Sequence, residues 1–220
     1  MALSQWKSRH AELYNRATTH HPYIVSIRNG SVDLSCYKRW LGQDYIFVKA
    51  FVRFIGSILA KIPSNASDET LMTLLSGASA LHDELQWFQK EALVWKIGLE
   101  DLPPKKTTQD YCRFLEDMSQ PSVDYAVVLS TFWAIEHVYF ESFAFCLEPG
   151  SKTPHQLVEA CGRWGSPSFG SYCDLLRSIA EAAVESTGSN EVKQRGEDAF
   201  VRVLQLENEF WNMSTDVSQE

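Results

Sequence analysis

Three acidic residues lie on the aromatic sides of the amphipathic segments to which they belong, where a water-soluble helix does not normally carry a charge. They are Asp44, Glu136 and Glu207. A carboxylate among buried rings loses its hydration, so it must find hydrogen-bond partners, shift its pKa upward or bind a ligand. A carboxyl group with a raised pKa can serve as a general acid or base near neutral pH. The three acids therefore predict a polar site inside an apolar core.

Spacing along a helix supports this interpretation, because residues three or four apart share one face. Each acid has an aromatic residue three places further on, namely Phe47, Tyr139 and Phe210. Glu209 lies two places beyond Glu207 and should face solvent instead. The same spacing is typical of a structural carboxylate that a core hydroxyl, an amide or a basic side chain satisfies. Spacing by itself leaves the catalytic and the structural interpretation open for each acid.

The aromatic residues around the acids favour a flat heteroaromatic ligand. Rings can stack on such a ligand, while carboxylates bind its amino groups and ring nitrogens. Trp133 precedes Glu136 by three residues, and Tyr111 and Tyr139 could add phenolic hydroxyls to the same site. A buried tyrosine is more often a core ring whose hydroxyl is satisfied, and that alternative stays open as well.

Motifs for metals and common cofactors are missing from the sequence. No Glu is followed three places later by His, as a helical di-iron centre requires. There is no His-Glu-x-x-His, Walker loop, Gly-x-Gly-x-x-Gly or Gly-x-Ser-x-Gly motif either. We therefore expect neither a metal nor a cofactor.

Charge and composition limit the partners. The 220 residues carry a formal net charge of −8 with a pI near 5.3, which disfavours binding to nucleic acid or to anionic membranes. No apolar run is long enough to span a membrane and the N-terminus resembles no signal peptide, so a cytoplasmic protein is expected. The five cysteines include no Cys-x-x-Cys pair and are interpreted as reduced, mostly core residues.

Apolar residues recur at helical spacing through nearly the whole chain, and period-two alternation is absent. This predicts an all-α fold, a compact bundle of seven to eight helices in a single domain over residues 1–220. Asp33 and Ser67 are expected to cap two long helices, and Thr107 or Thr108 a short one. His21-Pro22 is expected to interrupt the first helix, which starts near Ser4.

Three segments together resemble the TenA family of thiamin salvage enzymes over essentially the whole chain. They are WLGQDYIF at 40–47, FWAIE at 132–136 and LExxFW at 206–211. More narrowly, the chain resembles the plant TenA proteins that lack the active-site cysteine, the TenA_E type. The resemblance implies the haem oxygenase-like, all-α TenA fold with a deep site in the bundle. It assigns the position of the missing thiol to Thr131 and that of a missing pocket tyrosine to Ser168.

The resemblance also implies roles for particular residues. It makes Asp44 the carboxylate that holds the pyrimidine amino group, Phe47 an aromatic wall and Tyr111 a pocket tyrosine. It makes Glu207 an acid–base carboxylate and Glu136 the glutamate diagnostic of the cysteine-free branch. The catalytic residues are therefore predicted to be Asp44, Glu136 and Glu207. The substrate-binding residues are predicted to be Asp44, Phe47, Tyr111, Trp133, Tyr139 and Glu207.

The activity that this branch implies is hydrolysis of an aminopyrimidine. N-formyl-4-amino-5-aminomethyl-2-methylpyrimidine would be deformylated, and the resulting amine hydrolysed to the hydroxymethylpyrimidine. We expect water attack assisted by Glu136 or Glu207, with the other acid protonating the leaving nitrogen. Alternatives are a non-catalytic pyrimidine-binding or regulatory protein, and haem degradation with His20 or His21 as the iron ligand. A homo-oligomer, with a dimer favoured, is also expected.

Overall fold

The helical spacing of the sequence is realised almost throughout the computed structural model, which describes residues 1–215. These residues form ten helices and no strand. The helices are α1 (Ala2–Arg9), α2 (Ala11–Ala17), α3 (Pro22–Asn29), α4 (Leu34–Ala60), α5 (Asp68–Trp95), α6 (Lys106–Met118), α7 (Tyr125–Phe145), α8 (His155–Gly165), α9 (Pro167–Ser186) and α10 (Asn190–Thr215). The predicted all-α class is confirmed.

The helix count exceeds the predicted seven or eight because of two features near the N-terminus. The backbone leaves helical geometry at His10, with φ −110° and ψ 27°, which divides the expected first helix into α1 and α2. Pro22 begins α3 instead of only interrupting a helix, since proline is well suited to the first helical position. The His21 side chain caps α3, and Gly30, with φ 72°, ends it in the left-handed conformation.

Side-chain caps fix the starts of the two longest helices. The Asp33 carboxylate accepts from the Ser35 amide at 2.9 Å, and the Ser67 hydroxyl accepts from the Thr70 amide at 3.2 Å. Both caps were predicted. The predicted cap of α6 is wrong, because Lys105 occupies the N-cap position without a side-chain bond. The Thr108 hydroxyl instead donates to a buried amide oxygen of α4 at 2.6 Å.

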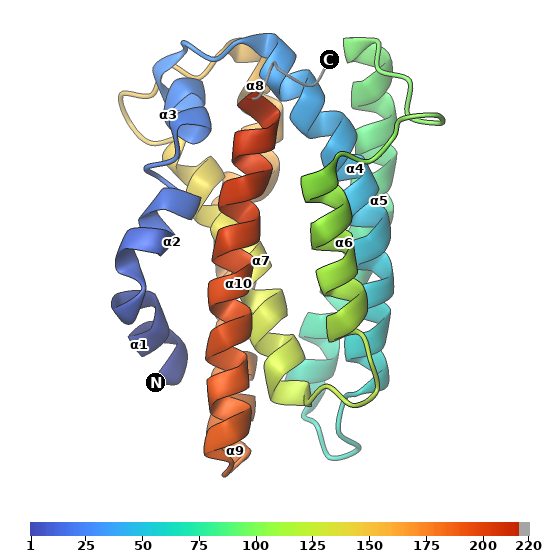
Figure 1. Cartoon of the computed structure of the whole chain (residues 1–220), viewed down its shortest axis with the longest axis vertical. Coiled ribbons are helices and arrows are strands. Elements are labelled where there is room, and N and C mark those ends of the chain that lie inside the picture. The colour runs from blue at the N-terminus through green and yellow to red at the C-terminus, as the bar shows by residue number, and fades with distance from the viewer. Residues whose placement is uncertain (216–220) are drawn as a thin grey trace.

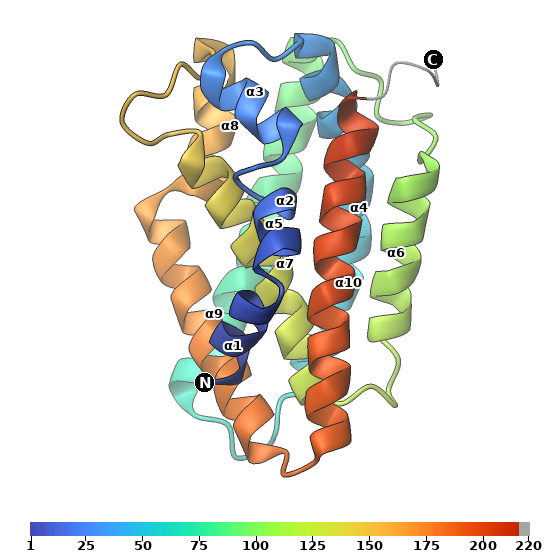
Figure 2. The same ribbon diagram turned by 60° about the vertical axis from the view of Figure 1, so that its left-hand side comes forward.

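Helix α7 is the central element of the bundle. Its successive residues 126–135 are all buried, which is typical of a helix surrounded by others. Helix α10 runs in front of α7 in Figure 1, and the turned view of Figure 2 brings α9 out beside α7. Helices α1 to α3 lie on the outside of this centre. A side chain on α7 can therefore meet residues from several helices.

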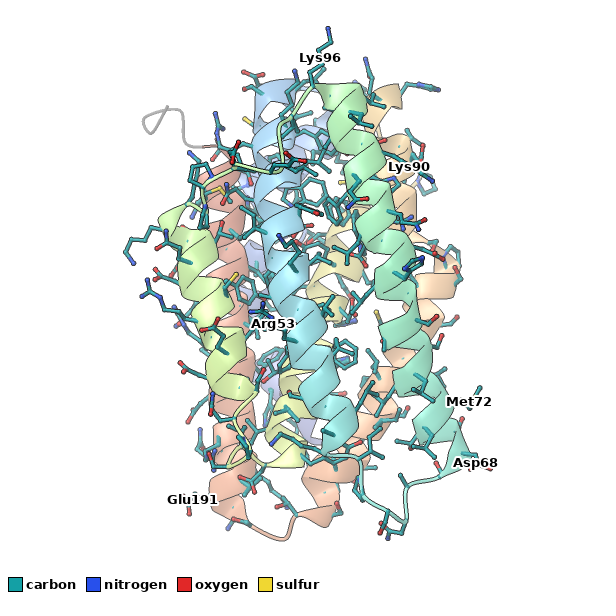
Figure 3. The ribbon with its side chains drawn as sticks, turned by 90° about the vertical axis from the view of Figure 1, so that its right-hand side faces the viewer. Arg53, Asp68, Met72, Lys90, Lys96 and Glu191 are labelled. Carbon is teal, nitrogen blue, oxygen red and sulfur yellow. The ribbon has the colours of Figure 1, made fainter. Side chains whose placement is uncertain are left out.

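On the other side of the molecule, α4 lies between α5 and α6 (Figure 3). Trp40 of α4 packs edge-on against Trp164 of α8, with ring centroids 5.7 Å apart and planes at 88°. Trp164 in turn contacts Tyr139 of α7 at 5.9 Å. Such ring contacts fix the relative positions of α4, α7 and α8. None of the helices within residues 1–215 combines the length and the apolar character needed to cross a membrane.

Candidate active site

Asp44 is buried between α4 and α7, with 1% of its surface exposed. The Tyr139 hydroxyl donates to its Oδ1 at 2.7 Å. Its Oδ2 is also buried and has no hydrogen-bond partner among residues 1–215. Burial raises the pKa of Asp44 well above its usual value, and the hydrogen bond from Tyr139 opposes this shift. A carboxyl group with one fixed and one free oxygen is suited to binding a polar ligand.

Glu207 of α10 repeats this arrangement with a different tyrosine. The Tyr111 hydroxyl of α6 donates to Glu207 Oε1 at 2.6 Å, while Oε2 is buried without a partner in the described part of the chain. Burial raises the pKa of Glu207 to about 8, although the hydrogen bond from Tyr111 lowers the pKa in part. Glu207 therefore carries a proton at neutral pH. Glu209 is exposed, as the helical spacing predicts.

Glu136 differs from these two acids because it is only partly buried. It lines a cavity of about 270 Å³ bounded by α5, α7, α8 and α9. The same cavity is lined by Ser76, Gly77, Ala80, Leu81, Glu84, Arg163, Ser166, Ser168, Phe169 and Tyr172. Removal from water raises the pKa of Glu136 well above its usual value. Asp44 and Glu207 do not line this cavity but lie deeper in the bundle.

Glu84 of α5 is a fourth acid of the site, and the sequence analysis missed it. Burial raises the pKa of Glu84 to about 7, while the Arg163 guanidinium and the Trp164 indole lower it. Helical spacing could have identified Glu84, because it follows Leu81 by three residues and precedes Phe88 by four. Arg163 and Tyr172, which also line the cavity, were not singled out either.

Charge interactions link Glu84 and Glu207 to the other two acids, Asp44 and Glu136. After burial, the charges of Glu84 and Glu207 are the next causes that raise the pKa of Glu136. The same two charges also raise the pKa of Asp44. Burial and mutual repulsion both disfavour ionisation of all four acids at neutral pH, so the group can hold protons and exchange them with a ligand. The arrangement is suited to general acid–base chemistry on a polar, uncharged or cationic molecule.

Aromatic rings pack beside the deep acids, and the role of Phe47 as an aromatic wall for a substrate stays a prediction. Phe47 packs on Tyr111 with ring centroids 4.6 Å apart and on Phe210 at 6.1 Å, so it covers the tyrosine that binds Glu207. Trp133 lies on another side of α7, where it stacks on Phe200 at 5.7 Å and on His137 at 5.2 Å. Its role as a substrate contact stays a prediction.

The position assigned to the missing thiol does not face the cavity. The Thr131 hydroxyl donates to the Val127 carbonyl of its own helix at 2.9 Å. Five residues correspond to roughly 140° of rotation around a helix, so Thr131 and Glu136 point in different directions. Ser168 does line the cavity, as expected of a remodelled wall. Thus Glu136, and not Thr131, is the polar residue that α7 contributes to this cavity.

The histidines considered as iron ligands are unsuited to that role. His20 is exposed on the surface. Nδ1 of His21 accepts from the Tyr23 amide at 3.1 Å, and its Nε2 lies 3.1 Å from Oδ1 of Asn212. Both ring nitrogens of His21 are therefore engaged. Within residues 1–215, no three His, Cys, Asp or Glu side chains are grouped in a way that could hold a metal ion.

Comparisons with known proteins agree with this fold and identify the family. The TENA/THI-4/PQQC family model matches residues 8–217. The chain is 45% identical over 211 residues to a probable bifunctional TENA-E protein of Glycine max, covering 95% of this chain and 91% of that protein. It is 24% identical over 220 residues to an aminopyrimidine aminohydrolase of Halalkalibacterium halodurans, covering 93% and 94% of the two chains.

Solved structures show the same fold. A TenA homologue from Pyrococcus furiosus superposes with a TM-score of 0.87 at 22% identity, over 97% of this chain and 100% of the other. The family model covers nearly the whole chain, and the soybean relative is similar over almost its full length. The predicted resemblance is therefore confirmed, and the chain belongs to the TENA/THI-4/PQQC family.

Proposed function

We propose that this protein is a thiamin salvage hydrolase that acts on aminopyrimidines. It would remove the formyl group of N-formyl-4-amino-5-aminomethyl-2-methylpyrimidine and hydrolyse the resulting amine to 4-amino-5-hydroxymethyl-2-methylpyrimidine. The name of the Halalkalibacterium relative, an aminopyrimidine aminohydrolase, supports this class of substrate, and the name of the soybean relative, a probable bifunctional protein, is consistent with two reactions. The observation that carries the proposal is the pair of tyrosine-held acids, Asp44 and Glu207, each with one free buried oxygen.

Asp44 would orient the pyrimidine. Its Oδ2 can bind the exocyclic amino group while Tyr139 keeps Oδ1 in place. Phe47 and Tyr111 would supply aromatic surface for the flat ring. Asp44 and Glu207 do not line the cavity to which Glu136 belongs, so binding of the ring at Asp44 would require side chains to move.

Glu136 and Glu207 would divide the proton transfers. Glu136 faces the cavity that water can enter, so it takes the proton of the attacking water. Glu207 has a pKa of about 8 and carries its proton at neutral pH, so it protonates the leaving nitrogen. The water oxygen bonds to carbon as the C–N bond breaks, and no thiol takes part.

The test is to incubate the purified protein with each pyrimidine and follow the products by mass spectrometry. Glu136→Gln should lower kcat by roughly 10²- to 10⁴-fold on both substrates, as expected for loss of a general base. Asp44→Asn should mainly raise KM. Glu141→Gln is the matched control on α7, since Glu141 pairs with Lys7 at 3.0 Å outside the cavity.

Full activity in Glu136→Gln and Asp44→Asn would contradict the assigned roles. If the wild-type protein binds both pyrimidines but converts neither, the non-catalytic binding function replaces the enzymatic one. Calorimetric titration with the amine distinguishes that outcome from a protein that does not bind pyrimidines at all.

A further inference from the structure

Tyr172 of α9 lines the same cavity as Glu84 and Glu136, and its phenolic hydroxyl packs beside Gly77, which also lines that cavity. The hydroxyl oxygen is buried and has no hydrogen-bond partner within residues 1–215. An unpaired buried hydroxyl costs stability, so its retention at a cavity wall suggests a ligand. The proton transfers proposed above make no use of it.

Gly77 of α5 creates the space for this hydroxyl. A Cβ atom at position 77 would lie 2.0 Å from the Tyr172 oxygen and 3.0 Å from its Cζ. Both distances are too short for any side chain larger than hydrogen unless Tyr172 moves. Glycine at the centre of a helix costs about 0.5–1 kcal/mol relative to alanine, so the glycine has a packing or functional reason.

The phenol keeps its proton and can act as a hydrogen-bond donor. Burial raises the pKa of Tyr172, and the charges of Glu136 and Glu84 raise it further. Other donors also line the cavity, namely the hydroxyls of Ser76, Ser166 and Ser168 and the Arg163 guanidinium. This guanidinium lies 5.1 Å from the Trp87 ring centroid, and its charge offsets that of Glu84. Tyr172 is thus a neutral donor on the cavity wall that also carries Glu136, and unlike the serine hydroxyls there its hydroxyl is both buried and unpartnered among the described residues.

We propose that the Tyr172 hydroxyl donates a hydrogen bond to the formyl oxygen of the substrate and so determines the deformylation activity. This inference rests on the function proposed above. Water attacks the formyl carbon, its proton passes to Glu136, and the carbonyl electron pair moves onto the oxygen that Tyr172 binds. The pair then returns, the C–N bond breaks, and the leaving nitrogen takes the proton of Glu207, while the released formic acid ionises to formate. A fixed donor at such an oxygen stabilises the developing charge.

Amine hydrolysis does not require a hydrogen-bond donor at a carbonyl oxygen, so the two reactions should depend on Tyr172 differently. Hydrolysis of the aminomethyl group replaces nitrogen by water at a carbon that bears no carbonyl oxygen. Tyr172 therefore contributes to deformylation but not to amine hydrolysis. A residue with a merely structural role would affect both reactions alike, since they share the aminopyrimidine ring.

The experiment compares kcat and KM for both substrates in Tyr172→Phe and the wild-type protein. We expect deformylation to lose roughly 10²-fold in kcat, the range found when one such donor is removed, while amine hydrolysis changes far less. Tyr125→Phe is the matched control, because its hydroxyl is also buried and unpartnered but lines a different hollow. Circular dichroism and thermal melting verify that each variant is folded.

Gly77→Ala provides an independent test that keeps the phenol. Gly77→Ala should reproduce the selective loss of deformylation. In the Tyr172→Phe background, where the crowded hydroxyl is gone, adding Gly77→Ala should lower kcat for deformylation much less. Gly56→Ala on α4 is its control, since a Cβ there meets no atom within 4 Å.

Equal losses on both substrates, or no loss in Tyr172→Phe, would overturn the role of Tyr172 and leave the proposed function intact. A wild-type protein that converts neither pyrimidine would overturn the proposed function and this inference together. A wild-type protein that hydrolyses the amine but never the formylated compound would overturn the inference and the deformylation step of the proposed function, and would leave amine hydrolysis standing.

Discussion

Asp44, Glu136 and Glu207 have similar aromatic neighbours in the sequence, but they differ in burial and are therefore suited to different chemical roles. Asp44 and Glu207 are almost fully enclosed, and each accepts a hydrogen bond from a tyrosine of another helix. Glu136 reaches a cavity and accepts no such bond among the described residues. A carboxyl group with a fixed oxygen can orient a ligand, whereas one that meets water can accept its proton. Glu84 adds a charge that raises the pKa of Asp44 and of Glu136.

Glu84→Gln tests this electrostatic coupling. Removing the charge of Glu84 should lower the pKa of Glu136, so the rising limb of kcat/KM against pH should move to lower pH. The measurement is kcat/KM for the amine between pH 5 and 9. Asp83→Asn, at the exposed neighbouring position, should leave the limb unchanged. An unmoved limb in Glu84→Gln would show that Glu136 is not the group that limits the rate.

Cys173→Ala tests whether a thiol takes part. Cys173 is buried, and its pKa is raised first by burial and then by the charge of Glu136, which indicates that the thiol lies near the cavity. A protonated thiol is a poor nucleophile. We expect kcat to stay within about three-fold of the wild type, less than 1 kcal/mol of barrier. Loss of turnover in a folded Cys173→Ala protein would show that the Cys173 thiol takes part in the reaction.

At the scale of the element, the close contact of α8 with α7 determines where Arg163 and Trp164 lie. A Cβ at Gly165 would come within 2.5–2.7 Å of the α7 backbone at Phe143 and Ala144. Backbone atoms cannot move aside as a flexible side chain can, so this glycine allows α8 to end directly against α7. The Trp164 and Arg163 side chains are thereby held beside Tyr139 and the cavity.

Gly165→Ala should therefore destabilise the protein by about 1–3 kcal/mol, the usual cost of overpacking. Gly162→Ala, one turn earlier in α8, meets nothing within 4 Å and should be neutral or stabilising by about 0.5–1 kcal/mol. Urea unfolding of both variants measures the difference. Equal stabilities for the two would mean that α8 adjusts to the added methyl group without cost.

For the whole molecule, the burial of several acids links folding to pH. The pKa of Glu207 is about 8 in the folded protein, whereas a glutamate in the unfolded chain titrates near 4.3. Between these values the folded state binds more protons than the unfolded state. The contribution of Glu207 to stability is therefore complete below about pH 4.3 and is lost as the pH rises through about 8.

Glu207→Gln should remove this part of the pH dependence. The free energy of unfolding of the wild type minus that of the variant should fall steadily from pH 5 to 8, as measured by urea unfolding at each pH. Glu209→Gln is the control, because Glu209 is exposed on the same helix. A difference that is flat or rises across this range would contradict a raised pKa for Glu207.

The sequence determined the helical class and most helix boundaries, and it marked three of the four acids described above, Asp44, Glu136 and Glu207. Helical periodicity and caps such as Asp33 and Ser67 depend on neighbours a few residues away, so they can be predicted locally. The aromatic spacing around Asp44 and Glu207 correctly marked their burial. The resemblance to TenA proteins came from the same segments. The single-domain extent, the homo-oligomer and the individual site roles stay predictions.

Tertiary structure alone decided how the helices rotate against one another, and this rotation selects the residues of the cavity. It turns Thr131 away, brings in Glu84 and Arg163, and lets Glu136 reach the cavity while Asp44 and Glu207 lie behind it. These outcomes depend on contacts between helices distant in sequence, such as Tyr172 against Gly77. Periodicity shows which side of a helix is apolar, but not which neighbour that side meets, and the neighbour determines the chemistry.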